Sequence, residues 1–306
     1  MSVRPIANAL VARFGRQRPL RGGSLIVTVF GDAIAPRGGA VSLGSLIRLM
    51  APFGLTERLV RTSVARLADE DWLSGRRSGR LSEYSLSALG RQRFADATLR
   101  IYAGPPSGWS GRWTLVLMLD VDAARRRQIR DTLRWEGFGE PETGILAHPT
   151  LTPEETRDHL QVVGLAGEAL ILQSRCASAE DDRRLLTAGW DLRDLATRYL
   201  RFIRSFAPVL PALQDRAPVE PGAAFLIRSL LIHEYRKIHL RDPLLPSALL
   251  PADWPGTRAY ELCRAIYERV LLAAEEHLSQ IAERLDGPLP APEAAVFRRF
   301  AGLLPG

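Results

Sequence analysis

The sequence predicts a multidomain α+β protein: a winged helix-turn-helix module, a central ferredoxin-like α/β domain and a helical C-terminal domain. Its 306 residues suffice for two or three domains, and 46% hydrophobic with 25% charged residues is typical of a globular chain. A Gly/Pro/Ser run at 103–111 (AGPPSGWSG) breaks the pattern, and a change from strand-like to helical sequence near Cys176 breaks it again. We therefore expect domains at 1–106, 107–176 and 177–306.

Cysteine content and apolar runs exclude two classes of protein. Cys176 and Cys263 are the only cysteines, too few for a disulfide framework or a four-thiolate metal site. The longest apolar stretches, such as 115–119, fall far below the ~20 residues that span a bilayer. The first twenty residues carry arginines where a signal peptide needs an apolar centre. We expect a cytoplasmic protein that does not enter the membrane.

The positive charge is concentrated in the first third of the chain. Net charge is +7, and Lys237 is the only lysine among 41 basic residues. Residues 1–103 hold 16 arginines against seven acids, whereas the remainder is slightly acidic. Genomic base composition can explain a preference for arginine but not its uneven distribution. The first third is therefore predicted to meet a polyanion, with nucleic acid ahead of an acidic membrane surface.

The first segment reads as helices followed by a hairpin and a closing helix. An apolar run at 24–34 precedes a short helix at 43–51 that Ser42 caps. Thr56 caps a second short helix at 57–69. At 100° per residue its apolar residues Val60, Val64 and Leu67 share one stripe. The opposite stripe carries small and basic residues, namely Arg58, Arg61, Thr62 and Ala65, with Arg66 at its flank.

Two strands between 72 and 86 are predicted to enclose a tip with three arginines, before a helix at 86–101. This order is that of a winged helix-turn-helix, in which the second helix enters a major groove and the hairpin reaches phosphates or the minor groove. An ordinary solvated helix face would also carry such arginines, but the hairpin and the local charge favour DNA binding. A basic N-terminal arm would add affinity or be a tail without a role. The expected DNA contacts are Thr56, Arg58, Arg61, Thr62, Arg66, Arg76, Arg77 and Arg80.

The middle segment alternates strand and helix. Strands are expected at 113–119, 144–147 and 169–172, with helices at 122–135 and from Thr152 onward. A ferredoxin-like sandwich fits this order, with one strand left unplaced. Asp120 and Asp122 follow the first strand, where two carboxylates could hold a divalent ion for phosphodiester hydrolysis. Helix capping by Asp122 is the favoured interpretation.

The third segment is predicted to be helical, chiefly at 190–210 and 255–285, with a polar cluster at 233–243 (HEYRKIHLRDP). A zinc-protease helix would need histidine at 237, which is lysine, so no metal or catalytic site is predicted. The cluster is either a ligand pocket, with Arg236, Lys237 and Arg241 holding phosphates or carboxylates, or a buried network that ties helices together. The residues alone favour the network.

Five segments together resemble a known family: SLIVTVFGD, LVRTSVARLADEDWL, GRLSEYSLSALGR, GWSGRWTLVLML and HEYRKIHLRDPLLPSALLPADWPG. The sequence is similar, over nearly its whole length, to the PaaX family of bacterial repressors of phenylacetic acid catabolism. The resemblance implies a recognition helix at 57–69, a wing between 72 and 86, a central domain like that of CRISPR-associated Cas2 proteins, and release from DNA by phenylacetyl-CoA. Because a coenzyme A thioester carries phosphates that these basic residues could hold, the resemblance favours the ligand pocket over the buried network. The candidate effector-binding residues are His233, Glu234, Arg236, Arg241, Asp242 and Trp254.

The sequence is thus interpreted as a cytoplasmic, homodimeric repressor that binds a double-stranded operator and releases it on binding an acyl-CoA effector, with no cofactor, metal or catalytic residue. Dimerisation is expected because one winged helix reads few base pairs. A metal-dependent nuclease using Asp120 is the alternative, and a nucleic-acid scaffold without sequence preference is a third possibility.

Overall fold

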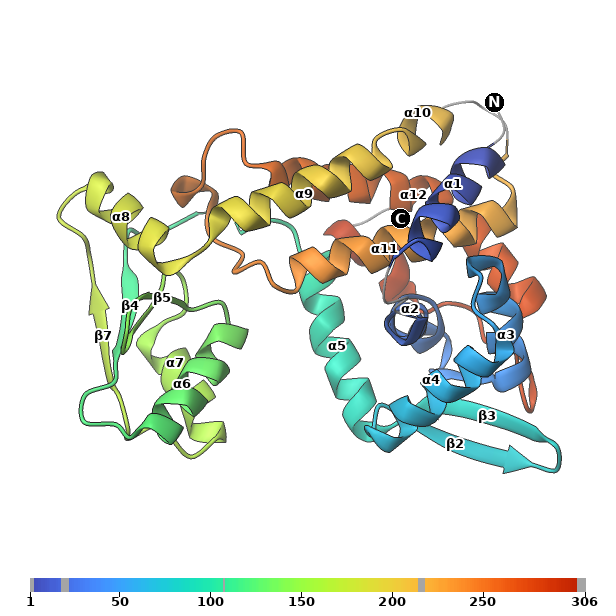
Figure 1. Cartoon of the computed structure of the whole chain (residues 1–306), viewed down its shortest axis with the longest axis horizontal. Coiled ribbons are helices and arrows are strands. Elements are labelled where there is room, and N and C mark those ends of the chain that lie inside the picture. Colours follow the sequence, from blue (N-terminus) through green and yellow to red (C-terminus); the bar gives the residue numbers. More distant parts are fainter. Residues whose placement is uncertain (1–2, 18–21, 107, 214–217, 302–306) are drawn as a thin grey trace. The chain divides into compact units, whose positions relative to one another are not determined.

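The computed structural model describes residues 3–17, 22–106, 108–213 and 218–301, which form two compact units. The first unit draws its described residues from Met1–Gly104, Arg201–Leu240 and Arg258–Gly306, and the second from Pro105–Leu200 and Arg241–Thr257. Figure 1 shows the elements of each unit. The units do not follow the chain order of the three expected domains, because long helices of the last segment pack on the first.

Among its described residues, the N-terminal part of the first unit is mainly helical up to residue 69 and includes one short strand. Its elements are α1 (Arg4–Gly15), α2 (Gly22–Val29), the π-helical turn Phe30–Ile34, the 3-10 turn Ala35–Arg37, β1 (Ala40–Ser42), α3 (Leu43–Met50), the 3-10 turn Ala51–Phe53 and α4 (Glu57–Asp69). The predicted helices at 43–51 and 57–69 are confirmed, together with their caps, since Ser42 accepts a hydrogen bond from Ser45 N and Thr56 accepts one from Leu59 N.

The segment expected as a basic arm is instead helical over Arg4–Gly15. Ala7, Leu10 and Phe14 recur at helical spacing, are buried, and place α1 against α11 (Pro221–His239). This apolar spacing was the available signal in the sequence. The arginines expected in that arm are Arg4, Arg13, Arg16, Arg18 and Arg21, and of these Arg18 and Arg21 lie outside the described residues.

A small antiparallel sheet and one helix complete the N-terminal part. Strands β2 (Leu73–Ser78) and β3 (Leu81–Leu86) form the predicted hairpin, and β1 adds a third strand in the order β1-β3-β2. Helix α5 (Ala88–Tyr102) follows, with Ser87 as its N-cap. The sequence reading did not anticipate β1, because three residues are too few to show an alternating pattern.

The second unit contains a four-stranded antiparallel sheet in the order β5-β6-β4-β7. Its elements are β4 (Trp113–Leu117), α6 (Ala123–Trp135), β5 (Gly139–Glu142), β6 (Ile145–His148), α7 (Pro153–Val162), β7 (Leu170–Ser174) and α8 (Ala179–Gly189). This β-α-β-β-α-β order and strand arrangement are those of a ferredoxin-like sheet. The unplaced strand is β5, whose Gly-Glu-Pro-Glu sequence lacks the residues typical of strands. A core that includes Val116, Ile129 and Leu160 joins the sheet to α6 and α7.

Helices dominate the rest of the chain. They are α9 (Leu192–Phe206), α10 (Val209–Leu213), α11 (Pro221–His239), the 3-10 turn Ser247–Leu249, α12 (Pro255–Ile281) and the irregular 3-10 segment Ala294–Ala301. Between α12 and the last segment, two-residue strands β8 (Glu283–Arg284) and β9 (Gly287–Pro288) form a tight turn.

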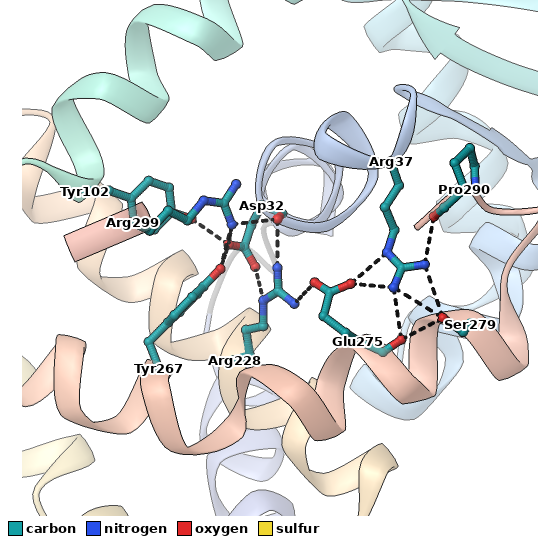
Figure 2. Close-up of polar contacts among 9 residues, drawn as sticks. All are labelled: Asp32, Arg37, Tyr102, Arg228, Tyr267, Glu275, Ser279, Pro290 and Arg299. Carbon is teal, nitrogen blue, oxygen red and sulfur yellow. Dashed lines mark hydrogen bonds and ion pairs between the residues drawn. The ribbon is translucent and has the colours of Figure 1, made fainter. Parts of the chain in front are cut away.

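A buried network of charges holds the first unit together (Figure 2). Asp32, in the π-helical turn, accepts hydrogen bonds from Arg228 of α11 (2.7 Å) and Arg299 (2.9 Å). Glu275 of α12 pairs with Arg228 at 2.5 Å and with Arg37 at 2.5 Å. The hydroxyls of Tyr102 and Tyr267 donate to Asp32 at 2.5 and 2.9 Å. The network therefore fastens the N-terminal helices to the C-terminal ones from inside the core.

Candidate nucleic-acid interface

The position of α4 is set by a glycine turn before it and an apolar face behind it. Gly54 adopts a left-handed conformation (φ +80°), which lets the chain reverse between α3 and α4 without strain. Val60, Val64 and Leu67 are buried and pack toward α2 and α3, as the stripe predicted. The opposite face of α4 is therefore turned to solvent.

The outer face of α4 carries the four predicted side chains Arg58, Arg61, Thr62 and Arg66, all of them exposed. Arg61 pairs with Glu57 one turn earlier at 2.7 Å, and Arg66 lies 3.5 Å from Glu70. Thr62 donates its hydroxyl to the carbonyl of Arg58 at 2.9 Å. No acidic partner of the Arg58 side chain is found within the described part of the chain. Thr56 serves as the helix cap, and its residue is also exposed.

The hairpin follows α4 in the sequence, carries further arginines and is closed by a two-residue turn. Ser78 pairs with Leu81, so that Gly79 and Arg80 form the turn, with Gly79 at φ +58°. The expected three-arginine tip is therefore shorter than predicted, because Arg76 and Arg77 belong to β2 and only Arg80 lies in the turn.

The three hairpin arginines differ in their partners. Arg77 and Arg80 are exposed and form no ion pair with any described residue. Arg76 donates to Asp286 at 2.8 Å and to Glu83 at 3.2 Å. The hydrogen bond and charge of Asp286, followed by those of Glu83, raise the pKa of Arg76 above its ordinary value. Alternating side chains of β2 place Arg76 and Arg77 on opposite faces of the hairpin.

The candidate effector residues fall into two groups. His233, Glu234 and Arg236 lie on α11 in the first unit, and Arg241, Asp242 and Trp254 belong to the second unit.

Two of the three residues of the α11 group contact α2. His233 is fully buried and shares a 3.0 Å hydrogen bond with the Thr28 hydroxyl. Arg236 donates to Thr28 Oγ1 at 2.8 Å and to the Ser24 carbonyl at 2.8 Å. Burial lowers the pKa of Arg236 to about 10. Glu234 accepts from Gln17 at 2.9 Å and lies 3.3 Å from Lys237.

The second group centres on Tyr199. Asp242 is buried and accepts a hydrogen bond from the Tyr199 hydroxyl at 2.6 Å and another from Leu244 N at 2.8 Å. Trp254 is 8% exposed and packs edge-on against the Tyr199 ring. Arg241 is exposed, and no ion pair with another described residue involves it. Asp242 and Trp254 thus contact side chains of their own unit, whereas the Arg241 side chain is exposed.

Sequence reasoning placed a buried network at 233–243 and missed the buried charge network around Asp32. Its one sequence signal is Arg228, a charged residue within an apolar run of α11 that is buried without interruption from Ala223 to His233. A charge in such a position requires a buried partner. The partners could not be named from the sequence, because Asp32 and Arg228 are 196 residues apart.

The middle domain offers no support for the nuclease alternative. Asp122 is the N-cap of α6, where its carboxylate accepts hydrogen bonds from the backbone N–H groups of Ala124 and Arg125 at 2.9 and 3.0 Å. The backbone hydrogen bond from Arg125 is the main factor that lowers the pKa of Asp122. No cluster of three or more potential metal ligands was found in the described ranges. The capping interpretation of Asp122 is confirmed.

Family models and one relative together cover most of the chain. Family models match residues 21–90 (PaaX-like protein), 106–186 (PaaX protein central Cas2-like domain) and 190–280 (PaaX-like protein C-terminal domain). The chain is 38% identical over 289 residues to the transcriptional repressor PaaX of Escherichia coli K12, covering 93% of this chain and 92% of that protein. A solved structure of the uncharacterized protein Rv0674 from Mycobacterium tuberculosis is 26% identical, with a TM-score of 0.47, and covers 75% of this chain and 89% of that one.

This similarity places the protein among transcriptional regulators, a class that is not enzymatic. The chain belongs to the PaaX family of repressors, and its central domain is Cas2-like. Within the described residues, no helix is long and apolar enough to cross a membrane.

Proposed function

We propose that this protein is a sequence-specific repressor that binds its operator through a winged helix-turn-helix formed by α3, α4 and the β2–β3 hairpin. In this proposal α4 enters the major groove, where the forked guanidinium of Arg61 can contact a guanine. Arg77 and Arg80 contact phosphates beside the groove. The repressor acts in the cytoplasm on genes of phenylacetate-type catabolism.

One observation carries the proposal: Arg58, Arg77 and Arg80 are exposed, and no described acid neutralises them. An exposed cation with an acidic neighbour attracts a polyanion only weakly. A cation that no acid neutralises can pair with a phosphate and release the counterion condensed on the DNA there. Arg61 pairs with Glu57 one turn earlier at 2.7 Å, but both side chains are more than half exposed, so a base can replace this weak pair. The surface thus combines unneutralised positive charge with one further arginine on the outer face of α4.

The proposed repressor acts as a homodimer, because two modules related by a two-fold axis read a palindrome. Release follows from an effector that binds the DNA-incompetent arrangement more tightly, with a coupling free energy of about 1–3 kcal/mol. An acyl-CoA such as phenylacetyl-CoA is the proposed effector. Arg241 supports this role, since its guanidinium is exposed and can pair with a coenzyme A phosphate.

A gel shift on DNA from the upstream region of the protein's own gene, with and without phenylacetyl-CoA, tests the proposal. We expect a discrete complex that survives excess unrelated duplex and dissociates on addition of the thioester. Equal affinity for upstream and unrelated DNA would overturn sequence-specific repression. A specific complex that the thioester leaves intact would overturn the effector assignment alone.

Arg241→Ala tests the effector site. We expect it to keep wild-type operator affinity and to lose release by phenylacetyl-CoA, because only the thioester's phosphate loses a partner. Arg193→Ala is a matched control, since Arg193 is exposed in the same unit and forms no ion pair within the described ranges. Unchanged release in Arg241→Ala would remove Arg241 from the effector site.

A further inference from the structure

The β8–β9 turn, residues 283–288, packs against the three-stranded sheet in the first unit. Glu283 N donates to the Ser45 hydroxyl at 2.9 Å, and Leu285 N donates to Glu83 at 2.8 Å. Asp286 accepts from Arg76 at 2.8 Å. The end of the C-terminal helix α12 is therefore connected to both strands of the hairpin that the proposed function assigns to DNA.

Glu83 is the centre of this connection. It lies on β3 directly opposite Arg76 of β2, and its residue is only 5% exposed. One of its carboxylate oxygens accepts from Arg76 at 3.2 Å and the other from Leu285 N at 2.8 Å. A buried carboxylate is costly unless such donors satisfy it. The hairpin and the C-terminal turn must therefore stay in register for Glu83 to remain paired.

The segments on both sides of the turn are also fixed. Before it, Arg48 of α3 donates to the carbonyl of Ile281 at 3.0 Å. After it, Arg37 donates to the carbonyl of Pro290 at 3.0 Å, while the same guanidinium pairs with Glu275 of α12 (Figure 2). These contacts thus fix the position of the turn relative to the hairpin.

Resting on the proposed function, we propose that the 283–288 turn positions the hairpin for DNA, with Glu83 and Asp286 as positioning residues and Arg76 as their anchor rather than a phosphate ligand. This changes the role that the sequence suggested for Arg76. Arg77 lies on the other face of the hairpin and keeps its role as a phosphate contact. Because the turn follows directly after α12, the position of the hairpin also depends on that helix.

The slope of binding against salt concentration separates an anchor from a phosphate contact. A lost phosphate contact reduces the slope of log K against log salt by about 0.9. We expect Asp286→Ala to weaken operator binding about two- to five-fold, the range of one exposed ion pair, with the slope unchanged. Arg76→Ala should weaken it at least as much, also with the slope unchanged, because it removes the contact with buried Glu83 as well. The double variant should bind no more weakly than Arg76→Ala, because that change already removes the contact with Asp286.

Arg77→Ala is the matched arginine control and should flatten the slope. Glu276→Ala, an exposed acid on α12, is the matched acid control and should change neither affinity nor slope. Hydrogen exchange adds a readout that a general loss of stability does not mimic. In Asp286→Ala the amides of 73–86 should exchange faster while those of α4 keep their rates.

Two results would overturn the positioning role. One is a slope reduced by Arg76→Ala as much as by Arg77→Ala, which makes Arg76 a phosphate ligand. The other is tighter DNA binding by Asp286→Ala, which makes Asp286 a competitor for Arg76. Failure of the wild-type protein to bind the upstream DNA specifically would instead overturn the proposed function, and the exchange experiment would still test the turn.

Discussion

The first unit uses arginine in two opposite ways. Arg37, Arg228 and Arg299 are between 1% and 6% exposed, and each pairs with a carboxylate of Asp32 or Glu275. Arg58 on α4 and Arg80 at the hairpin turn are exposed and have no acidic partner among the described residues. The same side chain therefore fastens the core in one place and leaves positive charge for a ligand in the other.

The difference shows that surroundings, and not residue type, decide what an arginine contributes. Burial works against the charge of Arg228, but the carboxylates of Asp32 and Glu275 outweigh it and raise the pKa of that guanidinium above its usual range. Burial likewise works against ionisation of Asp32, and Arg228 with Arg299 lowers its pKa nonetheless. The buried groups stay charged because they are paired, so removing one member leaves an uncompensated charge.

Arg228→Met should produce the largest loss of stability. The substitution keeps an unbranched side chain but leaves Asp32 and Glu275 without their shared partner. Breaking a buried ion pair in this way costs about 3–5 kcal/mol of unfolding free energy. Urea unfolding followed by circular dichroism would measure the loss.

Arg58→Met is the matched exposed variant, and the comparison predicts the reverse pattern. Its unfolding free energy should stay within about 0.5 kcal/mol of wild type, while its DNA affinity falls. Loss of stability in Arg58→Met comparable to that in Arg228→Met would end the distinction between the two sets of arginines.

His239 extends the comparison, because it is a buried basic side chain that stays uncharged. Its ring lies between the Tyr235 hydroxyl and the carbonyl of Arg100, each at 3.1 Å, with no carboxylate among these partners. Since the carbonyl can only accept, Nε2 carries the proton and Nδ1 accepts from Tyr235. Burial lowers the pKa of His239 from 6.5 to about 4.

The folded protein therefore binds fewer protons at His239 than the unfolded chain does between pH 4 and 6.5. Its contribution to stability is complete above pH 6.5 and is lost as the pH falls to about 4, a change of about 3 kcal/mol. Unfolding free energies across this range should show that slope, and His239→Asn should reduce it. His277, whose pKa burial also lowers, is the matched site, and His277→Asn should reduce the slope less because that ring is only half-buried. An unaltered slope in His239→Asn would contradict the assignment.

Local sequence predicted much of the fold where each element depends on its own residues. The caps Ser42, Thr56 and Asp122, the buried stripe of α4 and the hairpin were all readable, because side-chain caps and apolar periodicity act within a few residues. The short strand β1 was not readable, since its place depends on pairing with β3 some forty residues later. The π-helical turn that carries Asp32 likewise depends on long-range partners.

The candidate interface was predicted in part for the same reason. Exposure of Arg58 follows from its place on α4, but the partners of Arg76 do not follow from the hairpin sequence. Asp286 lies 210 residues later, beyond the reach of any local pattern. The interleaved units have the same origin, because α11 and α12 reach the N-terminal helices only through long-range packing.

Arg61→Ala, compared with Arg77→Ala, gives the most specific effect. Arg61 lies on the exposed face of the helix that the proposal places in the major groove, so its loss should relax discrimination at one base pair by about 1–3 kcal/mol. Arg77→Ala should weaken all sequences alike and flatten the salt slope. Titrations of the operator and of single-base variants at several salt concentrations separate the two. If both variants weaken binding equally for all sequences, α4 is a phosphate-contacting surface and base reading lies elsewhere. If only Arg61→Ala reduces the affinity difference between operator and variant DNA, α4 reads bases and the hairpin contacts the DNA backbone.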